Sequence, residues 1–165
     1  MKIKIPYPYP NGSKSVEVEA LPLIMRKEFA QQIVDGTKKF EVRDCSPFYD
    51  RIFLNPAKKE EFAKFLKTGE HPNKKAWLDM HYYTRDTNDN DFPGWVHFHN
   101  YSNSWSLDVE IVDVDLAVAD ENYNSILNHI GCHELDEMVK ECENEETLSL
   151  YYIITLGNIV NRENI

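Results

Sequence analysis

The hydrophobic pattern of this chain changes its period at Gly36, and this change constrains the fold more than any other feature. Before the glycine, four apolar residues between 29 and 34 fall on one stripe of a helix that we expect over 27–35. After it, Phe40 and Val42 alternate with charged residues, as in a strand. Glycine adopts the left-handed conformation that ends many helices. The pattern therefore predicts a helix that ends at Gly36 and leads directly into a strand.

The remaining patterns favour strands over an alternating strand–helix series. We expect strands at 2–5, 16–26, 38–44, 76–83, 95–101, 105–119 and 148–156, and helices at 27–35, 57–67, 122–130 and 133–144. The strand at 105–119 changes its apolar parity between Ile111 and Val112, which predicts a bulge. This order indicates an α+β fold with a mostly antiparallel sheet or barrel and peripheral helices. The 165 residues contain no repeat, so we expect a single domain over 1–165.

Charge is distributed unevenly along the chain. The net charge is −10, yet residues 1–75 hold 15 Lys or Arg against 10 Asp or Glu, and residues 76–165 hold 3 against 18. The overall acidity argues against duplex DNA as a partner. The asymmetry predicts either one electropositive face on an acidic body or a surface on which the two halves mix their charges.

The cysteines and the hydropathy of the chain indicate the cellular compartment in which we expect the protein. The three cysteines form no C-x-x-C pair, which argues against a disulfide scaffold and fits the reducing cytoplasm. The N-terminal segment has no apolar run, and no stretch approaches 18 apolar residues, so we expect no secretion and no membrane span. P-loop and dinucleotide-binding motifs are absent from the sequence, and we expect no cofactor.

The densest group of charged residues follows the helix at 27–35. Lys39, Glu41 and Arg43 share one face of the expected strand, and Lys38 lies at the corner between helix and strand. Arginine suits bidentate phosphate recognition, and a desolvated lysine can serve as a base. The alternative is a solvated strand face with ion pairs of little energetic value.

The segment 21–44 resembles the opening of the ASCH domain, a family of the PUA-like superfamily. The resemblance is carried by Leu-Ile-Met-Arg at 23–26, Phe-Ala-Gln-Gln-Ile at 29–33 and Gly-x-Lys-x-x-Glu-x-Arg at 36–43. It implies a β-barrel with a cleft lined by Lys38, Glu41 and Arg43, and binding of RNA or modified nucleosides. Some similar proteins hydrolyse acetylated cytidine or RNA, with the lysine in the catalytic role.

Two departures from the family pattern bear on these expectations. The amidohydrolase branch has threonine where this chain has Glu41. Residues 45–75 form a Lys-rich helical insertion where family members turn quickly into the next strand. The insertion is either a phosphate-tracking surface or a solvated helix face.

A second group combines histidine with aromatic residues. Trp95, His97, His99 and Tyr101 share one face of a strand, and His81 is expected on a neighbouring strand. Three interpretations remain open: a half-exposed sheet face, a platform for stacking unpaired bases, and a metal site built from the three histidines.

These observations lead to one main hypothesis and two alternatives. We expect binding of single-stranded RNA or a nucleoside-like molecule through Lys38, Lys39, Arg43, Trp95 and Tyr101. If an amide or phosphodiester is hydrolysed, we expect Lys38 and Glu41 to be catalytic. The alternatives are a metal-dependent hydrolase centred on His81, His97 and His99, and a non-catalytic module whose acidic half binds a basic protein partner.

Overall fold

The computed structural model describes residues 1–70, 80–142 and 149–165. The chain forms two compact units. The first unit comprises Met1–Lys39, Pro93–Val112 and Thr155–Ile165, and the second comprises Phe40–Phe92 and Asp113–Ile154. The organisation of residues 1–165 as one domain stays a prediction. Each unit is described by itself below.

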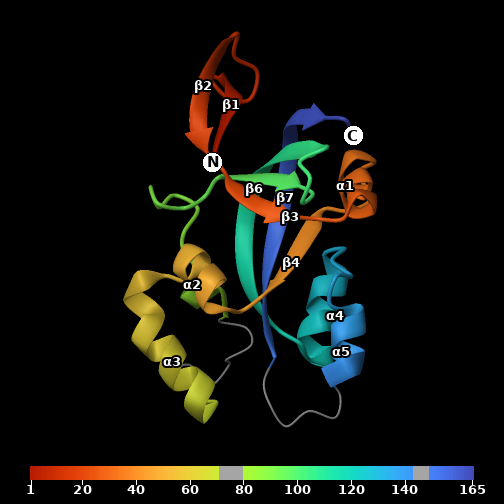
Figure 1. Ribbon diagram of the computed structural model, residues 1–165. Coiled ribbons are helices and arrows are strands. Elements are labelled where there is room, and N and C mark those ends of the chain that lie inside the picture. The colour runs from red at the N-terminus through yellow and green to blue at the C-terminus, as the bar shows by residue number, and fades with distance from the viewer. Residues whose placement is uncertain (71–79, 143–148) are drawn as a thin grey trace. The chain divides into compact units, whose positions relative to one another are not determined.

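The described elements confirm the α+β class (Figure 1). The strands are β1 (Lys2–Tyr7), β2 (Lys14–Glu19), β3 (Leu21–Ile24), β4 (Phe40–Asp44), β5 (Trp95–His99), β6 (Ser106–Val118) and β7 (Leu150–Glu163). The α-helices are α1 (Lys27–Val34), α2 (Pro47–Phe53), α3 (Lys59–Thr68), α4 (Glu121–His129) and α5 (Asp136–Cys142), and the short 3₁₀ helices are η1 (Pro56–Lys58) and η2 (Met80–Tyr83).

The strands form two sheets, and the described residues contain no closed barrel. β1 and β2 make a two-stranded antiparallel sheet, and five strands make a second sheet in the order β3-β5-β6-β7-β4. β3 pairs parallel with β5, whereas β5 pairs antiparallel with β6. The PUA-like barrel expected from the motif is thus replaced by a mixed sheet with β3 and β4 at the ends of its strand order. A barrel needs its edge strands to pair, and no pairing between these two is present in the described chain.

The first unit contains the helix and glycine predicted from the change of period. Ala30 and Ile33 are the buried residues of α1, and Gly36 has a φ of 79°, the left-handed conformation expected of it. Met25, which joins β3 to α1, donates its backbone N–H to the carbonyl of His99, the last residue of β5 (3.0 Å). This bond fixes the start of α1 against the end of β5.

The second unit contains two groups of helices. Asn55 accepts a hydrogen bond from the backbone of Ala57 (3.0 Å) and begins η1, as its position before Pro56 predicts. α4 and α5 lie side by side in Figure 1, and Asn124 of α4 donates to Asp136 of α5 (2.8 Å). These two helices cover a core of Ala117, Leu127, Cys132, Leu135, Val139 and Ile153.

Two further details differ from or refine the sequence prediction. The strand expected at 76–83 is wrong for residues 80–83, which form η2, and residues 76–79 lie outside the described residues. The predicted change of parity in β6 is confirmed by burial, because odd-numbered residues are buried up to Ile111 and even-numbered residues are buried from Val114.

In the described chain, no helix is long and apolar enough to cross a membrane.

Candidate functional site

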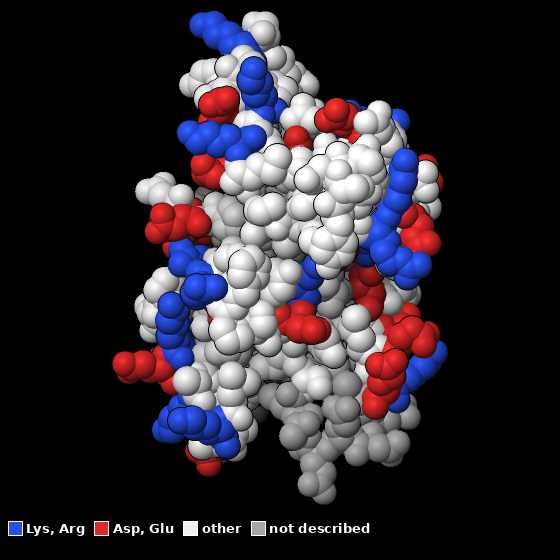
Figure 2. Space-filling view, in the orientation of Figure 1, with Lys and Arg blue, Asp and Glu red and all other residues white. Residues whose placement is uncertain are grey.

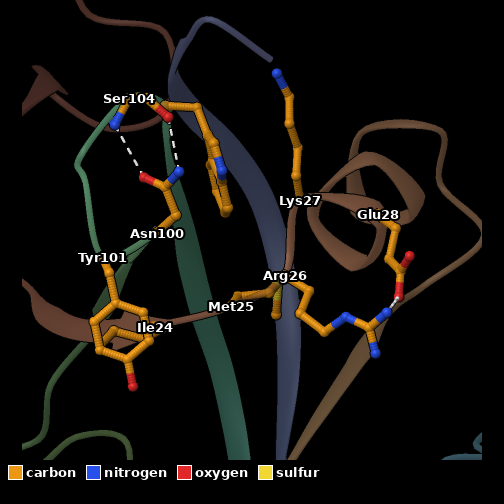
Figure 3. Close-up of a pocket in the computed structure, with 9 residues that line it drawn as sticks. Ile24, Met25, Arg26, Lys27, Glu28, Asn100, Tyr101 and Ser104 are labelled. Carbon is orange, nitrogen blue, oxygen red and sulfur yellow. Dashed lines mark hydrogen bonds and ion pairs between the residues drawn. The ribbon is translucent and has the colours of Figure 1, made fainter.

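The first unit contains an open pocket built from two chain segments. One wall is the connection from β3 into α1, and the other is the turn between β5 and β6 (Figure 3). The cavity volume is about 540 Å³. The lining residues are Ile24, Met25, Arg26, Lys27, Glu28, Asn100, Tyr101, Ser104 and Trp105.

Hydrogen bonds hold the turn that forms the second wall. The side chain of Asn100 accepts from the backbone N–H of Ser104 (2.9 Å) and donates to its hydroxyl (2.7 Å), as Figure 3 shows. Asn103 has a φ of 51°, a left-handed conformation that asparagine tolerates better than most residues. Asn164 donates to the carbonyl of Ser104 (3.1 Å). The turn is therefore fixed both locally and by a distant segment of the same unit.

Two aromatic residues of this turn have opposite environments. Trp105 is buried, whereas Tyr101 is 88% exposed. Ile24, which lines the same pocket, is also exposed. A large aromatic ring left in water at the rim of a pocket offers a flat surface for another ring.

The first wall carries the positive charge of the pocket. Arg26 forms an ion pair with Glu28 (2.5 Å) in which both side chains are mostly exposed, and Lys27 extends away from Arg26 in Figure 3. The guanidinium carbon of Arg26 lies 5.4 Å from the centre of the Phe29 ring, and the ammonium of Lys38 lies 5.7 Å from the same centre. One ring thus connects the pocket arginine to the motif lysine.

The motif residues have distinct environments within their units. Lys38 is buried in the first unit, while Lys39 is exposed and its carbonyl accepts from the backbone of Leu156 (2.9 Å). In the second unit, Glu41 is buried and pairs with Arg43 (2.9 Å). The interpretation as a solvated strand face is therefore wrong for Lys38 and Glu41. Their catalytic role stays a prediction.

Trp95, at the start of β5, packs against other residues of the first unit. Its ring packs edge-on against Tyr9, with centroids 4.9 Å apart, and it covers the core cluster of Ile3, Ile5 and Ala20. The two aromatic residues proposed for stacking, Trp95 and Tyr101, thus have different environments, and Tyr101 alone lines the pocket.

The three histidines do not share one strand face. The rings of His97 and His99 in the first unit lie 5.4 Å apart between centroids and are tilted by 31°, whereas His81 belongs to η2 of the second unit. His97 bonds to the buried Asp108 (2.5 Å), whose other oxygen accepts from Asn161 (2.9 Å). Among the described residues, neither His97 nor His99 belongs to a group of three donors close enough for one ion. The sheet-face interpretation therefore fits this pair best.

The second unit has its own pocket, of about 550 Å³. It is lined by Asp44, Cys45, Ser46, Pro47, Asp50, Leu66, Ser149, Leu150 and Tyr151. No lysine or arginine is among these residues. Burial, followed by the charges of Asp50 and Asp44, raises the pKa of the Cys45 thiol well above its ordinary value. The pocket therefore repels anions.

The face of the molecule in view in Figure 2 is not uniformly positive. Figure 2 shows Lys and Arg side chains next to Asp and Glu side chains on the face in view. In the helical segment rich in lysine, for example, Lys58 pairs with Glu61 (3.5 Å). Positive charge available to a ligand is consequently local, as it is at Arg26 and Lys27.

Sequence reasoning did not select Arg26, Lys27, Asn100 or Ser104. Arg26 belongs to the Leu-Ile-Met-Arg segment that carries the resemblance, but nothing in the sequence pattern indicated that it lines a pocket. Asn100-x-x-x-Ser104 is a polar turn between two strands, and such turns often carry binding residues. That signal could have identified the second wall.

No protein family, curated protein or solved structure matches this chain significantly.

Proposed function

We propose that the first unit binds single-stranded RNA or a nucleotide-sized ligand in the pocket between Ile24–Glu28 and Asn100–Trp105. The observation that carries this proposal is the 88% exposed ring of Tyr101 on the rim of a pocket that also contains Arg26 and Lys27. Nucleic acids present unpaired rings and phosphates together, and this pocket offers a partner for each.

Tyr101 supplies the surface on which a base stacks. Stacking of a base on an aromatic side chain contributes about 1–3 kcal/mol. The backbone of the turn is already fixed by the bonds between Asn100 and Ser104, so binding does not have to order it. The exposed Ile24 side chain adds apolar surface for the same base.

Arg26 and Lys27 supply the phosphate contacts. The ion pair of Arg26 with Glu28 is exposed to water and contributes little stability, so a phosphate can replace the carboxylate at small cost. Arg26 is also the N-cap of α1, and its side chain makes no capping bond. The positive end of the helix dipole at this first turn adds partial positive charge on the same wall.

The pocket is suited to binding without strong base selectivity. The carbonyl oxygen of the Asn100 side chain and one of its N–H groups are occupied by Ser104, which leaves little capacity to read a base edge. We therefore expect similar affinities for short RNAs of different sequence.

The resemblance to the ASCH domain supports the same class of ligand. Lys38 shares the Phe29 ring with Arg26, so the motif lysine belongs to the same cationic group as the pocket. Hydrolysis at Lys38 and Glu41 is a further step beyond binding and stays a prediction.

The test is fluorescence anisotropy of a labelled single-stranded octanucleotide with wild type, Tyr101→Ala and Tyr7→Ala. Tyr7 is a matched control, because it is a 58% exposed tyrosine of the same unit that does not line the pocket. Loss of the stacking platform is expected to raise the Kd about tenfold or more, and the control to leave it unchanged. Equal Kd values for the three proteins, or no binding by wild type, would overturn the proposal.

A further inference from the structure

A separate cluster in the second unit brings together one imidazole and two carboxylates. Asp113 and Asp115 occupy alternate positions of β6 and therefore point to the same side of the strand. His81 of η2 meets them there, with its Nδ1 2.5 Å from the Oδ1 of Asp115. One ligand atom from each residue lies within 4.8 Å of the other two.

The backbone on both sides of this cluster is fixed. Met80 and Tyr83, which flank His81 in η2, are fully buried, and Thr84 donates its hydroxyl to the His81 carbonyl (2.8 Å). Val114, between the two aspartates, is fully buried as well. The three donor side chains are thus presented by rigid segments, whereas their outer side is open to water at the exposed His81.

The cluster concentrates negative charge that no described cation neutralises. Within the described part of the chain, no lysine or arginine forms an ion pair with Asp113 or Asp115. Two carboxylates held close together repel each other, and a bound cation would relieve that repulsion.

The type of donor indicates the type of ion. A purely acidic cluster would suit Ca²⁺ or Mg²⁺, but an imidazole nitrogen favours first-row transition ions and Zn²⁺. Zinc binds nitrogen and oxygen ligands at about 2.0–2.2 Å, so two ligands of one ion lie at most about 4.4 Å apart. Small rotations of the side chains would bring the three atoms into this range. The contact between His81 Nδ1 and Asp115 Oδ1 would open to admit the ion.

We propose that His81, Asp113 and Asp115 bind one divalent transition-metal ion, with water in the remaining coordination positions. This site is independent of the pocket proposed for RNA, because all three ligands belong to the other unit. It replaces the metal site expected from His81, His97 and His99.

The first test is calorimetric titration of the EDTA-treated full chain with Zn²⁺, Mn²⁺ and Mg²⁺. One Zn²⁺ or Mn²⁺ is expected per chain, with Mg²⁺ binding at least about tenfold more weakly. His81→Ala and Asp113→Asn are each expected to raise the Kd for Zn²⁺ by about tenfold or more. His133→Ala is the matched control, because His133 is 65% exposed against 60% for His81 and also faces one carboxylate, that of Asp136 (3.3 Å).

Binding that is absent, or that is unchanged in His81→Ala and Asp113→Asn, would overturn the proposal. A second measurement needs no variant and is therefore insensitive to misfolding. Substoichiometric Mn²⁺ is expected to broaden the amide NMR signals around His81, Asp113 and Asp115 first. Broadening that begins instead around His133 and Asp136 would place the ion elsewhere and contradict the assignment.

Discussion

The pocket described in each unit has nearly the same volume, about 540 Å³ in the first unit and about 550 Å³ in the second, but the two have opposite chemistry. The first has Arg26, Lys27 and an exposed aromatic ring on its walls. The second has two aspartates and a thiol whose ionisation is suppressed. Volume alone therefore does not identify a ligand. The charge and the exposed ring on the walls make the first pocket the candidate for an anionic, aromatic ligand.

The largest effect is expected from reversing the charge of the first pocket. Arg26→Glu combined with Lys27→Glu replaces two phosphate contacts by two repulsions, and we expect the Kd for a short single-stranded RNA to rise by about 100-fold or more. Anisotropy measurements at low salt check this.

The matched control for this charge reversal is Lys64→Glu combined with Lys67→Glu. These are exposed lysines of α3 in the second unit, and the double substitution changes the net charge by the same amount. A comparable loss of affinity in this control would show that net charge, rather than the pocket, determines binding.

In the second pocket, a carboxylate is expected to serve stability rather than binding. The hydroxyl of the buried Tyr152 donates to Asp50 (2.7 Å), and Asp50→Ala leaves this hydroxyl without its acceptor. We expect the free energy of unfolding to fall by about 1–3 kcal/mol and RNA affinity to stay unchanged. Denaturant unfolding of Asp50→Ala, Tyr152→Phe and the double variant measures the coupling. Additive effects would contradict this role for the hydrogen bond.

The thiol of the second pocket is expected to react slowly. The thiolate is the reactive form, and a raised pKa for Cys45 reduces its population at every pH below that pKa. We expect iodoacetamide to modify native Cys45 at about pH 8 at least tenfold more slowly than in the urea-unfolded chain. Peptide mapping by mass spectrometry distinguishes Cys45 from the other cysteines. Equal rates in the two states would show that the pocket walls do not suppress ionisation.

The smallest effect on RNA affinity is expected from a change in salt concentration. Two phosphate contacts, at Arg26 and Lys27, predict a slope of about −1.4 for log K against log salt, since each contact contributes about −0.7 on single strands. The affinity should then fall about sevenfold between 50 and 200 mM salt. Anisotropy titrations at several salt concentrations give the slope. A much steeper slope would require an extended basic surface and would contradict a local site.

The elements predicted best from sequence are those specified by neighbouring residues. The helix ending at Gly36 and the start of η1 at Asn55 both depend on contacts within a few positions of the chain. α2 was missed, although Ser46 followed by Pro47 is the same type of start signal as Asn55 followed by Pro56. Its large apolar residues, Phe48, Tyr49, Ile52 and Phe53, also repeat the helical spacing seen between 29 and 34, so this helix could have been predicted.

The features that could not be predicted depend on contacts between distant segments. The pocket joins Arg26 to Tyr101, and the metal cluster joins His81 to Asp115. The local pattern around Tyr101 indicated an aromatic residue available for stacking, but nothing in it indicated which cations would accompany it. His81 was assigned to a strand because its segment alternates in hydropathy, whereas burial of Met80 and Tyr83 favours a tight helical turn there.

The hydrogen bond from Asn164 to Ser104 has a consequence for biosynthesis. The first unit is assembled from three stretches of chain, and its pocket turn is completed by residues 155–165. A ribosome must therefore translate the whole of the second unit before this turn can acquire its final support. Nascent chains arrested before Asn164 would carry Arg26 and Tyr101 without the complete framework that positions them, so competence for binding is expected to appear late in translation.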